Sequence, residues 1–108
     1  MNIALFGRHP SPAEHFVFPE GIPDDKMDDY SWMESQCWLW HTQVDESEFE
    51  KCGRMNIVRL YVEGFTPALI SFLRTWEVYW LGYGDSAPVL HLMHYLPDGT
   101  YGTQKWKG

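Results

Sequence analysis

Two short loops carry residue types that bind anions. Residues 7–11 read Gly-Arg-His-Pro-Ser, and residues 63–66 read Glu-Gly-Phe-Thr. A glycine lets backbone N–H groups approach a ligand closely, and an arginine pairs with a phosphate or carboxylate through two hydrogen bonds. The candidate ligand-binding residues are therefore Gly7, Arg8, His9, Ser11, Gly64, Phe65 and Thr66.

Three of these candidates, Thr66, Phe65 and His9, have side chains suited to particular contacts with a nucleotide. Thr66 is expected to cap the helix that follows it, so that its hydroxyl and the free N–H groups of the first turn face an anion. Phe65 offers a ring for base stacking, and His9 offers a proton donor or a phosphate contact. The structural alternative is that Gly64 makes a tight turn and Thr66 only caps its helix. Neither loop has the spacing of a P-loop or a dinucleotide-binding motif.

Histidines suggest metal ligation as a second kind of chemistry. His91 and His94 are three residues apart and would share a face only on a helix. Residues 89–95 are predicted to form a strand, in which the two imidazoles point to opposite faces. A metal-dependent hydrolase using His9, His91 or His94 also has no acidic ligands at matching spacing. We predict neither a metal nor a cofactor.

The serines and cysteines form no nucleophile motif. Ser11 and Ser71 lie outside the strained strand-to-helix turn on which hydrolases present a serine. Cys37 and Cys52 have no metal-ligand spacing. Two intracellular thiols are expected, with a disulfide between them as the alternative.

The charge of the chain disfavours one class of partner and leaves another open. Eight Lys and Arg residues against fifteen Asp and Glu residues give a net charge of −7. A protein that coats long nucleic acid normally has the opposite sign. Residues 1–52 carry a net charge of −8 and residues 53–108 a net charge of +1. A small anionic ligand can therefore bind the second half, since the local potential matters more than the total.

Residues 19–36 are the least regular part of the sequence and hold an acidic cluster. Asp24, Asp25, Asp28 and Asp29 lie close together, without the alternating oxygen ligands and closing glutamate of a calcium loop. The cluster is expected to be either a solvated surface or a contact for a basic protein partner.

Length and composition predict one domain over residues 1–108. A chain of this length with 17% aromatic residues can bury a core without metals or disulfides. No window approaches the roughly 18 consecutive apolar residues of a membrane helix. Residues 1–6 lack the basic flank and cleavage site of a signal peptide. We therefore expect a soluble, cytoplasmic protein with no membrane partner.

The first half must position the loop at residues 7–11. Residues 1–6 are a short apolar run ended by glycine, which predicts a buried first strand. Ser11, followed by proline and glutamate, signals the start of a short helix. Residues 37–44 are predicted to form a second strand with two alternating faces, and residues 45–51 a short helix or turn.

The second half must position the loop at residues 63–66. Residues 56–62 alternate as a strand. Thr66 and the proline after it begin a helix. Residues 89–95 and 101–106 are predicted strands, joined by a Leu-Pro-Asp-Gly-Thr hairpin turn. The apolar repeat of the helix comprises Leu69, Phe72, Leu73, Trp76 and Trp80.

This order of elements predicts the α/β class: a small Rossmann-like domain with a mostly parallel sheet and a C-terminal β-hairpin. Ligands of open parallel sheets bind beyond the carboxyl ends of the strands, where the two loops fall. Arg59 lies in the central strand, and a charged side chain there needs a partner or a cleft. We therefore expect the sheet face that carries Arg59 to be thinly covered.

Two stretches resemble a known family. Met-Asn-Ile-Ala-Leu-Phe-Gly-Arg-His-Pro at residues 1–10 is similar to the first strand and loop of small CRISPR-associated Rossmann-fold (CARF) proteins. Residues 56–72, a strand followed by Gly-Phe-Thr-Pro-Ala-Leu, are similar to the strand–glycine–helix unit near their ligand. A closing strand at residues 88–95 and a hairpin also fit, whereas residues 19–52 show no match.

The resemblance implies a function in prokaryotic antiviral signalling. CARF proteins are usually homodimers that hold a cyclic oligoadenylate second messenger across the two-fold axis, at the carboxyl ends of the strands. Some members cleave the ring through attack by the ribose 2′-hydroxyl, which needs no metal, and others only bind it. We expect binding before cleavage. The matched positions are Gly7, Arg8, His9, Ser11, Gly64, Phe65 and Thr66.

The acidic first half suggests a different function. A short chain whose aspartates imitate nucleic-acid phosphates would act on a basic protein partner. Such a chain would be an inhibitor, for example a phage-type anti-defence protein. The acidic residues of this hypothesis are Asp24, Asp25, Asp28 and Asp29.

Overall fold

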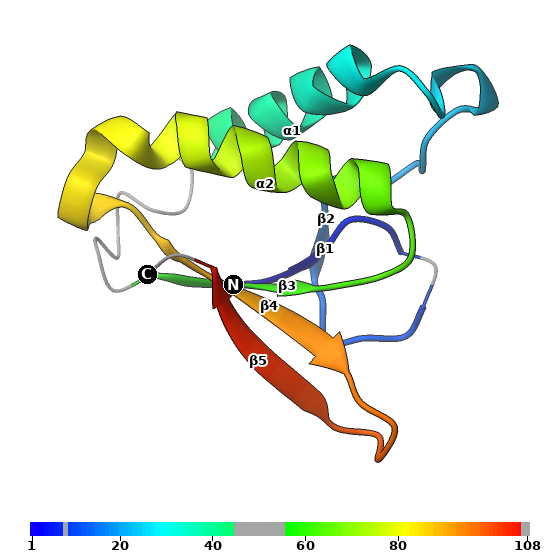
Figure 1. The fold of residues 1–108 in the computed structure, drawn as a ribbon, viewed down its shortest axis with the longest axis vertical. Coiled ribbons are helices and arrows are strands. Elements are labelled where there is room, and N and C mark those ends of the chain that lie inside the picture. Colours follow the sequence, from blue (N-terminus) through cyan, green and yellow to red (C-terminus); the bar gives the residue numbers. More distant parts are fainter. Residues whose placement is uncertain (8, 45–55, 107–108) are drawn as a thin grey trace.

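Five strands form one sheet in the residues that the computed structural model describes, which are 1–7, 9–44 and 56–106 (Figure 1). The strands are β1 (Asn2–Ala4), β2 (His15–Phe16), β3 (Ile57–Tyr61), β4 (Val89–Tyr95) and β5 (Tyr101–Trp106). Their order is β2-β1-β3-β4-β5, and all neighbours run parallel except β4 and β5, which form an antiparallel hairpin. The predicted α/β class, with its mostly parallel sheet and C-terminal hairpin, is confirmed.

Two long helices, α1 (Tyr30–Val44) and α2 (Thr66–Trp80), lie side by side on one face of the sheet (Figure 1). The chain passes from β2 to β3 through α1 and from β3 to β4 through α2. Both connections move in the same direction across the sheet, and crossovers of one handedness then place both helices on the same side. The other face of the sheet carries no helix of the described residues.

Alternation along the strands divides the sheet into a covered and a helix-free face. Val58 and Leu60 of β3 are fully buried, whereas Arg59 between them is only half-buried. The covered face packs against the helices and excludes water from a continuous apolar core. Among the described residues no helix covers the face that carries Arg59, which agrees with the thin cover predicted for it. Other core residues are Ile3, Leu5, Met33, Cys37, Trp40, Phe72, Trp76, Leu90 and Leu92.

The strand predicted for residues 37–44 is wrong, because this segment is the second half of α1. The buried residues of α1 recur at helical spacing and form one face of the helix. Trp38 and Leu39 are large apolar residues on its exposed side, and they hide the helical period in the sequence. The buried face comprises Met33, Cys37, Trp40, His41 and Val44.

The short helix predicted from Ser11 is also wrong. The Ser11 hydroxyl oxygen accepts a hydrogen bond from the Ala13 N–H at 3.2 Å, which closes a local turn and not a helix cap. His15 and Phe16 then pair with β1 as a two-residue parallel strand. The helix or turn predicted for residues 45–51 lies outside the described residues.

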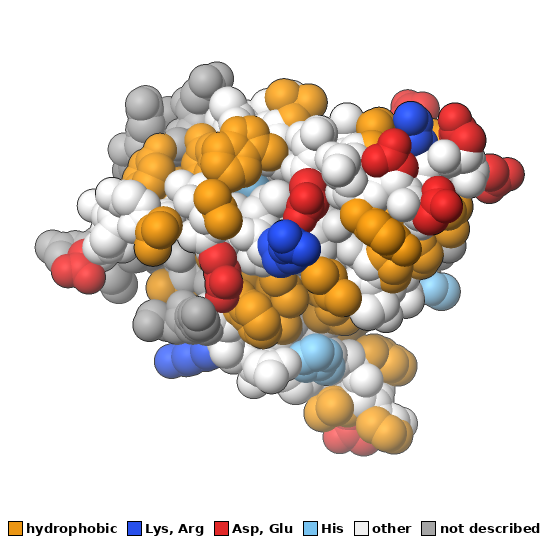
Figure 2. Space-filling view, turned by 45° about the horizontal axis from the view of Figure 1, so that its top comes forward, with side chains coloured by type: hydrophobic (Ala, Val, Ile, Leu, Met, Phe, Trp, Pro, Cys, Tyr) orange, Lys and Arg blue, Asp and Glu red, His pale blue; other side chains and the backbone are white. Residues whose placement is uncertain are grey.

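The acidic cluster caps a helix and also forms an exposed corner. The Asp29 carboxylate accepts the Trp32 N–H at 3.0 Å at the start of α1, and Lys26 pairs with Asp29 at 3.6 Å. Asp24 and Asp25 belong to the 3-10 turn η1 (Asp24–Lys26) and are exposed. Figure 2 shows these acidic side chains gathered over η1 and the beginning of α1.

The predicted strands and helix of the second half are confirmed, with small shifts at their ends. The 3-10 segment η4 (Leu81–Ser86) extends α2 before β4 begins. In the hairpin turn the Leu96 N–H donates to the Thr100 carbonyl at 2.8 Å, and Gly99 has a φ of 88°. None of the described helices is long and apolar enough to cross a membrane.

Gly99→Ala should destabilise the fold by about 1 kcal/mol. A Cβ at position 99 meets nothing closer than the Tyr95 hydroxyl at 3.8 Å, so the cost comes from the positive φ and not from a clash. Urea denaturation measures this change. Gly82→Ala is the matched control, since its φ lies outside that region and a Cβ has open space, and it should change stability by less than about 0.5 kcal/mol. Equal costs at both positions would contradict the argument.

Candidate functional site

The carboxyl ends of the parallel strands open into a pocket of about 480 Å³. Because β1, β3 and β4 run in the same direction, the segments that follow them meet at one edge of the sheet. We call this cavity the carboxyl-edge pocket. Its lining comprises His9, Pro10, Ser11, Tyr61, Val62, Glu63, Gly64, Tyr95 and Tyr101.

Three tyrosines from three different strands form the aromatic wall of the pocket. The Tyr61 and Tyr101 rings lie edge to face with centroids 4.9 Å apart, and Tyr101 makes a second edge contact with Tyr95 at 5.4 Å. Tyr61 is only 8% exposed, whereas Tyr95 is 67% exposed. The buried ring fixes the wall, and the exposed ring leaves an aromatic face on which a flat ligand can stack.

Glu63 connects the ends of two strands at this edge. Its carboxylate oxygen Oε1 accepts a hydrogen bond from the Phe6 N–H at 2.9 Å, which joins the segment after β3 to the segment after β1. The Val62 N–H donates to the Met93 carbonyl at 3.0 Å and joins the same segment to β4. These bonds hold the lining segments in place before any ligand arrives.

The structure brings together three of the predicted ligand-binding residues. His9, Ser11 and Gly64 line the carboxyl-edge pocket, although they come from two loops that lie far apart in the sequence. Gly7 instead borders a neighbouring hollow of about 340 Å³ between the segment after β1 and residues 18–22. Arg8 lies outside the described residues.

Phe65 and Thr66 are not part of the pocket lining. Phe65 is the N-cap residue of α2, and its partly buried side chain packs against the core. Thr66 is exposed in the first turn of the helix. The prediction that Thr66 caps α2 is wrong, because Phe65 occupies the cap position and no side-chain capping bond is present.

Sequence reasoning missed the tyrosines and Glu63 as site residues. Alternation already placed Tyr61 on the same face as Arg59. The Asp-Gly turn also implied that Tyr95 and Tyr101 pair across the hairpin, as they do. The missing information was the lateral order of the strands, which brings β3 beside β4.

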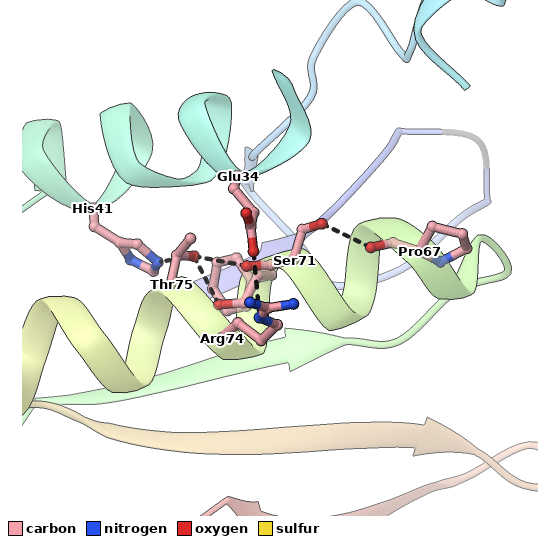
Figure 3. Close-up of polar contacts among 7 residues, drawn as sticks. Glu34, His41, Pro67, Ser71, Arg74 and Thr75 are labelled. Carbon is pink, nitrogen blue, oxygen red and sulfur yellow. Dashed lines mark hydrogen bonds and ion pairs between the residues drawn. The ribbon is translucent and has the colours of Figure 1, made fainter. Parts of the chain in front are cut away.

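A second group of polar residues lies between the two helices and combines the residue types of a nucleophile site (Figure 3). His41 Nε2 is 3.0 Å from the Thr75 hydroxyl oxygen. That hydroxyl also lies within hydrogen-bond distance of the Ser71 carbonyl at 2.9 Å and the Phe72 carbonyl at 3.0 Å. A hydroxyl that donates to either carbonyl accepts from the His41 N–H. Cys37 lies one turn before His41, fully buried, as a free thiol. Its predicted alternative disulfide partner, Cys52, lies outside the described residues.

Burial and the direction of the pKa shifts argue against a nucleophilic role for this group. Burial raises the pKa of the Cys37 thiol to about 12, and the opposing hydrogen bond from Thr75 offsets only part of this rise. Burial also lowers the pKa of His41 to about 3. A reactive cysteine needs a lowered pKa and an accessible position, so this group is structural. The His41 ring packs against the aromatic rings of Trp40, Phe72, Trp76, Tyr79 and Trp80.

The described residues contain no group of three or more His, Cys, Asp or Glu side chains that could hold a metal ion. His91 and His94 lie in β4 and point to opposite faces of the sheet, as predicted. His91 lies opposite Lys105 in the hairpin. His94 is 2.8 Å from the side-chain oxygen of Gln104.

No protein-family model matches the chain, and neither a curated protein nor a solved structure matches it. The carboxyl-edge pocket must therefore be interpreted from its own residues. The resemblance to CARF proteins stays a prediction.

His41→Gln should reduce the loss of stability in acid. The pKa of His41 is 6.5 when unfolded and about 3 when folded, so the unfolded state binds more protons between these values. The free energy of unfolding therefore has its full value, as far as His41 is concerned, above pH 6.5 and falls as the pH drops toward 3. The full loss is on the order of 5 kcal/mol.

Urea denaturation at several pH values measures this dependence. His94→Gln is the control for the loss of an imidazole. The argument fails if His41→Gln retains the wild-type pH dependence, or if His94→Gln reduces it equally.

Proposed function

We propose that the chain binds a nucleotide in the carboxyl-edge pocket, with the base against the tyrosine wall. The observation that carries this proposal is the convergence of Tyr61, Tyr95 and Tyr101 on one pocket at the carboxyl edge of a parallel sheet. Open α/β sheets bind their ligands at this edge. A volume of about 480 Å³ falls within the range of small-molecule sites.

The polar residues of the lining support a nucleoside over a purely apolar ligand. Glu63 uses one carboxylate oxygen for the Phe6 N–H, and its other oxygen is an acceptor for an amino group or a ribose hydroxyl. His9 and Ser11 lie in the segment after β1 and line the same pocket. A few polar groups in an otherwise aromatic site give a ligand its orientation.

The specific form of the proposal is a cyclic oligoadenylate, the ligand that the CARF resemblance implies. Such a ring would be shared by two copies of the chain, so the proposal includes a homodimer. We propose binding of this ring before any cleavage of it.

A nucleotide panel that includes cyclic tri-, tetra- and hexa-adenylate tests the proposal by thermal unfolding. A ligand at a hundredfold excess over its Kd adds about 2.7 kcal/mol of stability. Tyr95→Ala should weaken the binding about tenfold or more, since stacking on an aromatic side chain contributes about 1–3 kcal/mol per base.

Tyr30→Ala is the matched control for this experiment. Tyr30 is an exposed tyrosine at the start of α1, away from the pocket lining, and its loss should leave binding unchanged. The proposal is wrong if no nucleotide stabilises the protein, or if Tyr95→Ala binds as tightly as the wild type.

The exposed acidic corner supports a second candidate function, inhibition of a basic protein. Asp24, Asp25 and Asp28 are exposed, and the adjoining outer face of the helix pair carries exposed apolar side chains (Figure 2). A charged corner beside apolar surface is a combination that protein partners use. The exposed apolar residues of the two helices include Trp38, Leu39, Ile70 and Val78.

Salt dependence tests the second candidate. Binding to a basic target such as a nucleic-acid-binding protein should weaken steeply as ionic strength rises. Asp24→Asn combined with Asp25→Asn should reduce both the affinity and this dependence. Glu77→Gln, which removes an exposed carboxylate of α2, is the control. Salt-insensitive binding, or equal effects of the two variants, would rule out the acidic contact.

A further inference from the structure

A row of basic side chains crosses the helix-free face of the sheet. The register pairs Arg59 of β3 with His91 of β4, and His91 with Lys105 of β5. Directly paired residues point to the same face, so the three side chains are neighbours on adjacent strands, about 4.8 Å apart in the hydrogen-bonding direction. We call them the cation row. Asn2 of β1, opposite Arg59, continues the row toward the other edge.

The cation row is not neutralised within the described residues. The ion pairs found there join Lys26 to Asp29 and Arg74 to Glu34, and neither involves the row. Partial burial lowers the pKa of His91, and Lys105 and Arg59 lower it further. Arg59 and Lys105 carry positive charge, the His91 ring between them can gain a proton when an anion binds, and no ion pair of the described residues involves any of the three. The row is therefore a local site for an anion.

The cation row adjoins the carboxyl-edge pocket. Tyr61 follows Arg59 by two residues on the same face of β3, a separation of about 6.6 Å. Met93 and Thr103 separate the rest of the row from Tyr95 and Tyr101 on the neighbouring strands. The tyrosine wall and the cation row therefore form one continuous surface, with aromatic rings at one end and positive charge at the other.

We infer that Arg59, His91 and Lys105 form a phosphate-binding site on the helix-free sheet face. Resting on the proposed function, this site holds the phosphate of the nucleotide whose base lies in the carboxyl-edge pocket. The ligand class is thus a phosphorylated nucleotide or oligonucleotide and not a free nucleoside. The planar guanidinium of Arg59 suits the geometry of a phosphate. The adjacent tyrosines favour a ligand that carries a base over an acidic peptide.

Two probes separate the phosphate site from the pocket. Inorganic pyrophosphate has no base and tests the cation row alone. Linear 5′-phosphorylated triadenylate tests both the cation row and the carboxyl-edge pocket. Pyrophosphate should shift the His91 imidazole resonances in an NMR titration and raise the pKa of that ring, because a bound anion favours the charged form.

Lys105→Gln is the decisive variant, since Lys105 is exposed on the edge strand and its loss should not disturb folding. It should weaken triadenylate binding about tenfold and reduce the slope of log affinity against log salt by about one. Arg59→Gln, if this variant folds, should also weaken triadenylate binding and reduce the salt slope. Arg74→Gln removes the same charge from the outer face of α2 and should leave both probes unaffected.

The outcomes distinguish this inference from the proposed function. If triadenylate binds in a Tyr95-dependent way but Lys105→Gln and Arg59→Gln bind it like the wild type, the phosphate site is wrong and the pocket stands. A second outcome supports the phosphate site and contradicts the pocket. In it, pyrophosphate shifts the His91 imidazole resonances, Lys105→Gln abolishes that shift, and Tyr95→Ala binds triadenylate like the wild type. Binding of a glutamate-rich peptide at the row as tight as that of pyrophosphate would overturn the inference in favour of an acidic protein partner.

Discussion

In the described part of the chain, the helices cover only one face of the sheet, and the rest of the structure depends on this constraint. Two successive crossovers in the same direction, β2 to β3 and β3 to β4, place α1 and α2 on one face. That face must then be apolar, and the other is free to carry charge. Val58 and Leu60 meet the helices, while Arg59 between them faces away. A helix on each face would have buried this arginine without a partner, which is costly.

The buried polar group between the helices serves the core and not the chemistry. His41 is held neutral by burial, donates to Thr75 and fills a space enclosed by aromatic rings. The Nε2–Thr75 hydrogen bond ties α1 to α2 in one register, whereas the other ring nitrogen of His41, Nδ1, is buried without a hydrogen-bond partner among the described residues. Cysteine and histidine are residue types associated with catalysis. Burial raises the pKa of Cys37 and lowers the pKa of His41, so the thiol stays protonated and the imidazole stays neutral.

The carboxyl-edge pocket and the cation row belong to one surface because both lie where strands β3, β4 and β5 meet. Parallel pairing brings the end of β3 beside the end of β4, and the hairpin adds β5. The same register pairs Tyr95 with Tyr101 near the hairpin turn and places Arg59, His91 and Lys105 side by side further from it. The negative charge of the chain resides mainly in the first half, and the described acidic residues of that half include the corner at η1.

Local patterns in the sequence determined the elements of the second half. The alternation around Arg59, the apolar repeat from Thr66 to Trp80 and the Asp-Gly turn each act over a few residues. The tertiary structure decided what depends on distant neighbours. Residues 37–44 became helical because their buried face meets α2, although exposed Trp38 and Leu39 obscured the helical period. The site likewise depends on strand order and register, because only the sheet brings Tyr61, Tyr95 and Tyr101 together with His9.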